Sequence, residues 1–167
     1  MARVAFSTFG IMREKSGHPQ VQGFLDRISA TFAAADAAPG FLGGPDRNGA
    51  LAPSFLDPAL RDQEASTVSL WEDLHSVWAF AYRGLHAEAL QHRREWFGEP
   101  AWPNYVAWWV EDDHMPSWPE AAERYQHLHD HGSTAFAFTF KKPFGADGGP
   151  LTQRDVTTPA QTSGSAP

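Results

Sequence analysis

Hydrophobic residues recur along the chain with two different spacings, and the spacing changes from segment to segment. β-Forming residues alternate imperfectly over Arg3–Met12, which predicts a strand. Apolar residues three and four apart follow Pro19 and stop before Pro39–Gly40, which predicts a helix between these two breaks. Short strands are then predicted in the GFLGG segment and over Thr67–Trp71.

The same two spacings continue in the second half of the chain. Helical spacing runs from about Leu74 to Phe97, and Tyr105–Glu111 has the composition of a strand. A further helix is predicted with Ser117 as its N-cap and Gly132 just past its end. The STAFAFTFKK segment follows, with three phenylalanines at alternate positions, and predicts a last strand with one apolar face.

The predicted order of elements is β-α-β-β-α-β-α-β, which indicates an α+β protein. This order fits a ferredoxin-like split βαβ plan with one added helix, in which helices cover one face of an antiparallel sheet. We expect one domain over residues 1–142 and a disordered tail over 143–167, which is rich in Gly, Pro, Ser and Thr. The loop over residues 43–67 is long enough to be a lid. An open sheet face needs a cover, so a homodimer is predicted.

Composition narrows the function classes. The chain carries a formal net charge of −7, so a nucleic-acid partner is not expected, because phosphate-binding surfaces are basic. It contains no cysteine, which excludes disulfides and thiolate chemistry. No apolar run approaches the ~20 residues of a membrane span, and no signal peptide pattern is present. We therefore expect no membrane partner and a cytoplasmic location.

Candidate chemistry gathers on one stripe of the helix predicted over Leu74–Phe97. The stripe borders the apolar core stripe and comprises His75, Ala79, Tyr82, His86, Leu90, Arg93 and Phe97. Tyr82 and His86 are four residues apart and would meet on a continuous helix. Histidine moves protons near neutral pH, and Arg93 would bind an anionic oxygen. The stripe is either the wall of a pocket or a boundary that hydrogen-bonds to the long loop.

Other polar clusters give weaker signals. His114 follows a strand and is a candidate acid or base, or else it caps the next helix. The HLHDH segment places His127 and His131 four apart, but we expect no metal site because such residues are more often exposed. No phosphate loop, dinucleotide fingerprint or nucleophile elbow is present, so no nucleotide cofactor is expected.

Two long segments carry a resemblance to a known group of proteins. They are SLWEDLHSVWAFAYRGLHAEALQHRREWF, from Ser69, and AWWVEDDHMPSWPEAAERYQHLHDHGSTAFAFTF, from Ala107. They resemble a bacterial family of unknown function in the dimeric α/β-barrel superfamily, which includes the antibiotic biosynthesis monooxygenase-like proteins. The residues that carry the resemblance are Trp71-Glu72, Tyr82, His86, Arg93–Phe97, Trp108-Trp109, His114-Met115-Pro116 and His131-Gly132. The chain departs from the family pattern in its long loop and its C-terminal extension.

The resemblance implies a dimeric α/β barrel with a pocket between sheet and helices. Relatives in the superfamily oxidise phenolic polyketides without a cofactor, cyclise or isomerise reactive intermediates, or bind haem through a helix histidine. The leading hypothesis is an enzyme of secondary metabolism that acts on a hydrophobic, aromatic or polyketide-like metabolite. Its expected catalytic residues are His86, Tyr82, Arg93 and His114, and the residues expected to contact substrate are His75, Trp71, Trp96, Phe97 and Trp108. The alternatives are a non-covalent haem protein with His86 as ligand and a non-catalytic ligand-binding dimer. Trp71 and Trp108 are equally compatible with the core.

Overall fold

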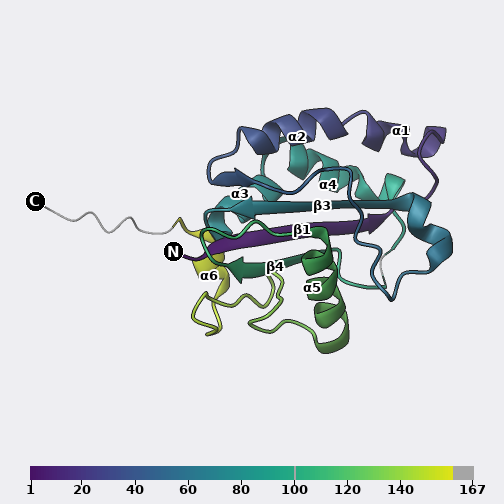
Figure 1. Ribbon diagram of the computed structural model, residues 1–167. Helices are drawn as coiled ribbons and strands as arrows, with labels where there is room; N and C mark the ends of the chain where they lie inside the picture. The colour runs from purple at the N-terminus through teal and green to yellow at the C-terminus, as the bar shows by residue number, and fades with distance from the viewer. Residues whose placement is uncertain (100, 160–167) are drawn as a thin grey trace, which may run out of the picture.

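The fold is built on one antiparallel sheet of four strands. A computed structural model describes residues 1–99 and 101–159 of the chain. The strands are β1 (Arg3–Ile11), β2 (Phe41–Gly43), β3 (Glu64–Trp71) and β4 (Tyr105–Val110), and they lie side by side in the order β2-β3-β1-β4 (Figure 1). β1 lies between β3 and β4, and Val4–Ser7 form a continuous buried run because both faces of the strand are covered. The strand order and the β-α-β-β-α-β start are consistent with the predicted ferredoxin-like plan.

Four helices form one layer on the first side of the sheet. They are α1 (Pro19–Leu25), α2 (Ile28–Asp36), α3 (Leu74–Tyr82) and α4 (Gly84–Trp96). In Figure 1 the last two lie behind the strands, and the first two lie along the β2–β3 side, packed on the fourth. Sequence spacing predicts two long helices here, and each is in fact interrupted. The break between α3 and α4 matters most, since it invalidates any stripe drawn across Leu74–Phe97.

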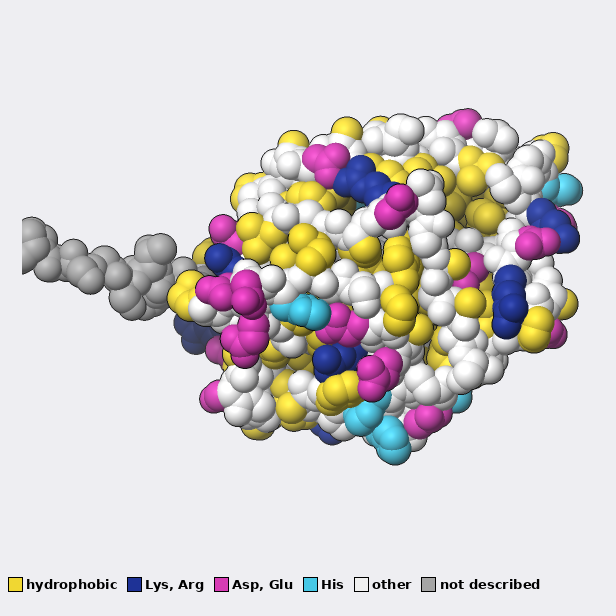
Figure 2. All heavy atoms as spheres, in the orientation of Figure 1, with side chains coloured by type: hydrophobic (Ala, Val, Ile, Leu, Met, Phe, Trp, Pro, Cys, Tyr) yellow, Lys and Arg dark blue, Asp and Glu magenta, His cyan; other side chains and the backbone are white. Residues whose placement is uncertain are grey.

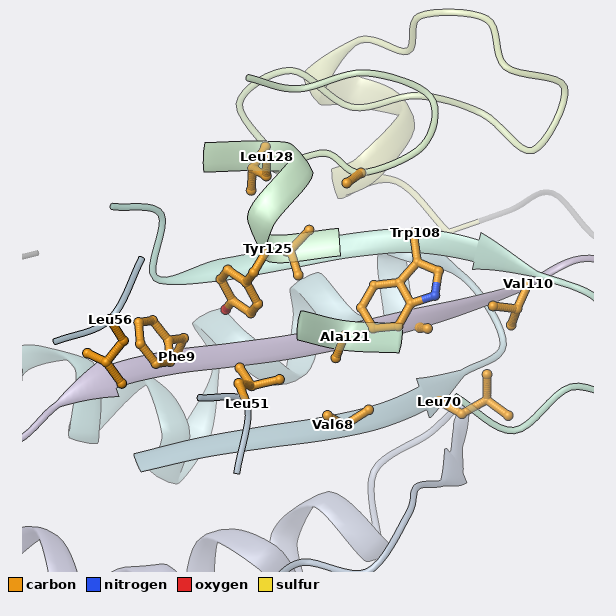
Figure 3. Packing of buried hydrophobic residues seen from close by; sticks show 13 residues of the cluster. Phe9, Leu51, Leu56, Val68, Leu70, Trp108, Val110, Ala121, Tyr125 and Leu128 are labelled. Atoms are coloured by element: carbon orange, nitrogen blue, oxygen red, sulfur yellow. The ribbon is translucent and has the colours of Figure 1, made fainter. Parts of the chain in front are cut away.

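The fifth helix, α5 (Trp118–His131), lies on the second face of the sheet, in front of the strands (Figure 1). It begins and ends as predicted, because the Ser117 hydroxyl accepts the Glu120 N–H and Gly132 adopts a positive φ of 72°. Its apolar side buries Ala121, Tyr125 and Leu128 against the sheet. They belong to one buried cluster, in which Figure 3 shows Tyr125 beside Phe9 and Ala121 beside Trp108.

The long loop completes the cover of the second face. Leu51 and Leu56 are buried in the same cluster as α5 (Figure 3). The Glu64 carboxylate holds the loop by accepting the backbone N–H groups of Leu51 at 2.6 Å and Ala52 at 3.0 Å. The predicted helical turn within the loop is present as the 3-10 helix η1 (Pro58–Gln63). The expectation of helices on one face and an open second face is therefore wrong, because α5 and the loop bury that face within the same chain.

The chain after α5 forms a bridge where a strand is predicted. STAFAFTFKK makes one isolated antiparallel bridge to the sheet, between Phe138 and Ala107 at the outer edge of β4. Phe138 and Phe140 are buried among first-face residues, whereas Phe136 is 38% exposed. The segment therefore crosses the sheet edge from α5 on the second face to the first face.

Residues 143–159 are folded, which corrects the expectation of a disordered tail starting at Pro143. A short helix, α6 (Gln153–Thr157), begins with a capping box formed by Thr152 and Asp155. Its Val156 is fully buried in the first-face cluster. Composition missed this because three apolar residues, Phe144, Leu151 and Val156, and one capping box anchor a segment that is otherwise rich in Gly, Pro and polar residues. Residues 160–167 lie outside the described part of the chain. Within that part, no helix combines the length and apolarity that crossing a membrane requires.

Candidate functional site

A cleft of about 430 Å³ opens on the helical layer, between α2, α3 and the start of α4. Small apolar side chains and the ring of Phe80 form most of its wall. Three other lining side chains, those of His75, Arg83 and His86, can carry positive charge. The lining residues are Ala34, Ala38, Pro39, His75, Ser76, Ala79, Phe80, Arg83, Gly84 and His86. This volume is in the range of small-molecule sites, which are concave and mostly apolar with a few polar groups.

The break between α3 and α4 forms one end of the cleft. Gly84 has a φ of 62°, in the left-handed region that glycine adopts without a steric penalty. Arg83 before it is extended, with φ −130° and ψ 156°. The chain therefore turns sharply after Tyr82 and starts a new helix, which brings His86 back over the last turn of α3.

A hydrogen bond to the backbone holds the neutral ring of His86 in one tautomer. Its Nδ1 lies 2.9 Å from the carbonyl oxygen of Ala81, which can only accept a hydrogen bond. Nδ1 therefore carries the hydrogen, and Nε2 keeps a lone pair in the neutral ring. Burial lowers the pKa of His86, and this outweighs the opposite effect of the Ala81 carbonyl. The ring is thus a neutral base at pH 7, beside Phe80 with ring centroids 5.1 Å apart.

His75 lines the same cleft from α3 and is held in a similar way. Its Nδ1 lies 3.3 Å from the carbonyl oxygen of Val156, so α6 fixes this ring from the other side. Among the described residues, no hydrogen bond is formed by Nε2 of either His75 or His86. The cleft is therefore lined by two imidazoles whose Nε2 atoms have no hydrogen-bond partner within the described residues.

A second hollow, of about 470 Å³, lies on the other face of the sheet beside the N-terminal end of α5. His114 lines it, and its Nε2 is 2.7 Å from Oε2 of Glu120. The other Glu120 oxygen accepts the indole N–H of Trp108 at 2.8 Å, and the Arg124 guanidinium lies 3.6 Å away. Acidic side chains gather next to this hollow, near the N-terminus (Figure 2).

The polar groups of the second hollow form one network of hydrogen bonds and ion pairs with one another. Burial alone would raise the pKa of Glu120, but the hydrogen bonds from His114 and Trp108, with the charges of His114 and Arg124, hold it below the usual value. Arg124 is itself fixed between Phe136, whose ring centroid is 3.7 Å from the guanidinium carbon, and Glu120. This network ties the 111–117 loop to α5. His114 takes part through a side-chain contact and does not cap the helix, because the N-cap is Ser117.

Comparisons with known proteins place the chain in a family. The model of a domain of unknown function, DUF3291, matches residues 3–154. The chain belongs to the DUF3291 family. The match includes the long loop, which is therefore part of the family domain, and it ends within α6. A search of curated proteins finds no match. Among solved structures, the NE2512 protein of unknown function from Nitrosomonas europaea is similar at 15% identity, with 70% of this chain and 97% of that chain covered and a TM-score of 0.45.

Two of the expected catalytic residues lie outside both hollows of this DUF3291 domain. Tyr82 is 48% exposed and packs against Trp78 and Phe140, with ring centroids 5.9 and 6.3 Å apart. It does not meet His86, because the helix break separates them. Arg93 is half-buried in the last turn of α4 and lines neither hollow.

The aromatic residues expected to contact substrate belong to the packing of the fold. Trp71, Trp96 and Trp108 are all at least 96% buried. The Trp71 indole donates to Ser69, and Trp96 packs on Phe24. Phe97 also packs on Phe24, with ring centroids 4.9 Å apart. Of the residues expected to contact substrate, His75 alone lines the cleft beside His86.

Phe80 and Arg83 are among the cleft residues that sequence spacing misses. The signal that could have found them is Gly84, a helix-breaking residue in the middle of the apolar pattern. Within the described ranges, no group of three or more His, Cys, Asp or Glu side chains is placed to hold a metal ion.

Proposed function

We propose that this DUF3291 protein binds a small hydrophobic metabolite in the α2–α3–α4 cleft and acts on it by acid–base chemistry at Nε2 of His86. The observation that carries the proposal is the hydrogen bond from His86 Nδ1 to the Ala81 carbonyl, at the edge of an apolar cleft. It fixes the tautomer, and burial keeps the ring neutral, so Nε2 is a base at pH 7.

His75 supplies a second proton-transfer group on the opposite helix of the same cleft. A base and a second imidazole across an apolar space suit reactions that remove a proton from one position of a ring system and return it elsewhere. The reaction classes that fit are cofactor-free oxygenation, cyclisation and isomerisation of aromatic or polyketide-like molecules. His114 lies in the other hollow, so the proposal does not require it.

The test is a screen of phenolic and polyketide-like compounds, with oxygen consumption and product mass measured for each. For any compound that turns over, His86→Ala should lower kcat/KM about 100-fold, the usual scale of a lost acid–base group. In the wild type, kcat/KM should fall at a pH below the ordinary histidine value of 6.5, because the pKa of His86 is lowered.

The matched control is His92→Ala. His92 is on the same helix, but its Nδ1 bonds to the Glu95 carboxylate at 2.8 Å, and it does not line the cleft. This variant should keep full turnover. Equal turnover in wild type and His86→Ala would refute the assignment of His86. Tight binding without turnover would replace the enzyme by a non-catalytic ligand-binding protein.

The second candidate function is non-covalent haem binding, and the same hydrogen bond favours it. Haem iron commonly takes a proximal histidine, and a ligating histidine usually donates its other ring N–H to an acceptor such as a backbone carbonyl. The donor set fits through Nε2 of His86. Haemin titration distinguishes the two functions: a Soret band that His86→Ala abolishes supports haem, and no uptake of haemin excludes it.

The dimeric α/β barrel and the homodimer stay predictions. The structure removes the simplest reason for them, because the second sheet face is already covered by α5 and the loop. A barrel would require these elements to move from residues such as Trp108 and Leu70, which are buried under them. Any dimer is therefore proposed to form through another surface. We propose no nucleic-acid or membrane partner and a cytoplasmic location, on the composition alone.

A further inference from the structure

We propose that the ligand of the α2–α3–α4 cleft is an amphipathic anion, with a hydrophobic body against the cleft wall and one oxyanion bound by Arg83. The oxyanion would be a phenolate, enolate or carboxylate. This inference rests on the proposed function, since it specifies the ligand of the same cleft. It also moves the anion-binding role from Arg93, where sequence spacing places it, to Arg83.

The first argument is the charge of the cleft lining. The chain has 20 acidic against 13 basic residues, yet none of the ten lining residues is Asp or Glu. The only lining side chain that is charged at every physiological pH is Arg83. A lining with one arginine and no acid group favours an anion over a cation inside the cleft, against the net negative charge of the whole chain.

The second argument is the position of Arg83. Arg83 links α3 to α4 in an extended backbone conformation, and its side chain is exposed. The guanidinium lies over the ring of Trp78, with 5.5 Å between its carbon and the ring centroid. Stacking of this kind orients an arginine and leaves the N–H groups at its edge available. Among the described residues, no carboxylate forms a salt bridge with Arg83.

The third argument concerns the other polar groups of the cleft. His86 is neutral at pH 7, so Nε2 is a proton acceptor and offers no positive charge to a bound anion. An ionised ligand group moved from water onto apolar walls is unfavourable unless a charged partner is present. Arg83 is the lining residue that meets this need, and its planar guanidinium matches a carboxylate or enolate.

The experiment uses two fluorescent probes that differ in one charged group. 1-Anilinonaphthalene-8-sulfonate carries a sulfonate, and N-phenyl-1-naphthylamine has the same rings without it. Both probes should bind the full-length protein, the anionic one about tenfold more tightly. Arg83→Gln should remove that tenfold preference and leave the Kd of the neutral probe unchanged.

Two further variants make the result decisive. Arg94→Gln removes an exposed arginine of α4 that lies outside the cleft, and it should change neither Kd. Ala79→Phe fills the cleft wall, so it should weaken both probes, with circular dichroism confirming that the variant is folded.

The outcomes separate the two proposals. If neither probe responds to Ala79→Phe, the cleft does not bind hydrophobic molecules, and the proposed function fails with the inference. If both probes bind in the cleft with equal affinity and Arg83→Gln changes neither, the inference alone is refuted. A loss of the anionic probe in Arg93→Gln, with Arg83→Gln unaffected, would return the role to Arg93 and also refute it.

Discussion

Glu120 shows how a single residue links three segments. It lies in the first turn of α5, and its carboxylate bonds to the ring of His114 in the preceding loop and to the indole of Trp108 in β4. Its side chain is 16% exposed, so the hydrogen bonds are partly protected from water. Together these bonds hold the pKa of Glu120 below its usual value against the effect of burial.

This lowered pKa predicts a pH-dependent contribution to stability. A carboxyl group whose folded pKa is below its unfolded value stabilises the protein above the unfolded value, about 4.3 for Glu, and the contribution is lost as pH falls through the folded pKa. Glu120→Gln should therefore lower the free energy of unfolding by about 1 kcal/mol at pH 6. The gap to wild type should shrink steadily in urea unfolding measured at decreasing pH below about 4.3.

The control for Glu120 is Glu123→Gln, which removes the same charge from an exposed position of the same helix. It should change stability little at any pH. A gap between Glu120→Gln and wild type that is constant from pH 6 to pH 3 would contradict the assignment of the carboxylate to this network.

The break between α3 and α4 is the element that decides the shape of the cleft. Helical spacing alone predicts one helix here, and Gly84 within it costs only about 1 kcal/mol relative to alanine, so the pattern tolerates it. The structure instead uses Gly84 to reverse the chain at a φ of 62°. His86 thereby bonds to Ala81, whereas on a continuous helix it would lie against Tyr82.

The position of Gly84 gives a prediction at this scale. Gly84→Ala should destabilise the protein by about 1 kcal/mol, because a Cβ is unfavourable in the left-handed region although no atom lies within 4 Å of it. Gly98→Ala is the matched control: its Cβ also meets open space, and its φ is not positive, so stability should stay equal or rise slightly. Thermal unfolding of both variants measures the difference. Equal effects would indicate a continuous helix.

At the scale of the whole molecule, the chain encloses its own sheet. It covers the first face with α3 and α4, on which α1 and α2 pack, and the second with the loop and α5. It then passes the edge of β4 at Phe138 and returns to the first face, where α6 packs against α3. This last segment also reaches the cleft, because the Val156 carbonyl fixes His75.

A substitution at Val156 tests whether the packing of α6 on the first face contributes to stability. Its side chain is fully buried, so Val156→Ala should lower the free energy of unfolding by roughly 2 kcal/mol through lost burial and a small cavity. Thr158→Ala, at an exposed position two residues on, should have almost no effect. Chemical denaturation measures both. A neutral Val156→Ala would mean that α6 is not packed in solution.

The sequence by itself determined part of the regular structure. The strands β1, β3 and β4 and the helix α5 with its caps follow from spacing and from capping residues, which are local properties of the chain. His86 could also be singled out, because a histidine next to an apolar stripe is visible in the sequence. These features need no information about distant residues.

Only the tertiary structure decided which side chains meet. It placed Arg83 and His75 with His86, left Tyr82 and Arg93 outside the cleft, and put Trp71, Trp96 and Trp108 in the core. It also brought α5 and the loop onto the face that the sequence leaves open, and packed α6 against α3 on the other face. The physical reason is that these outcomes depend on one left-handed glycine, on the Glu64 carboxylate and on buried apolar contacts between residues far apart in the chain, and spacing along a sequence contains none of this information.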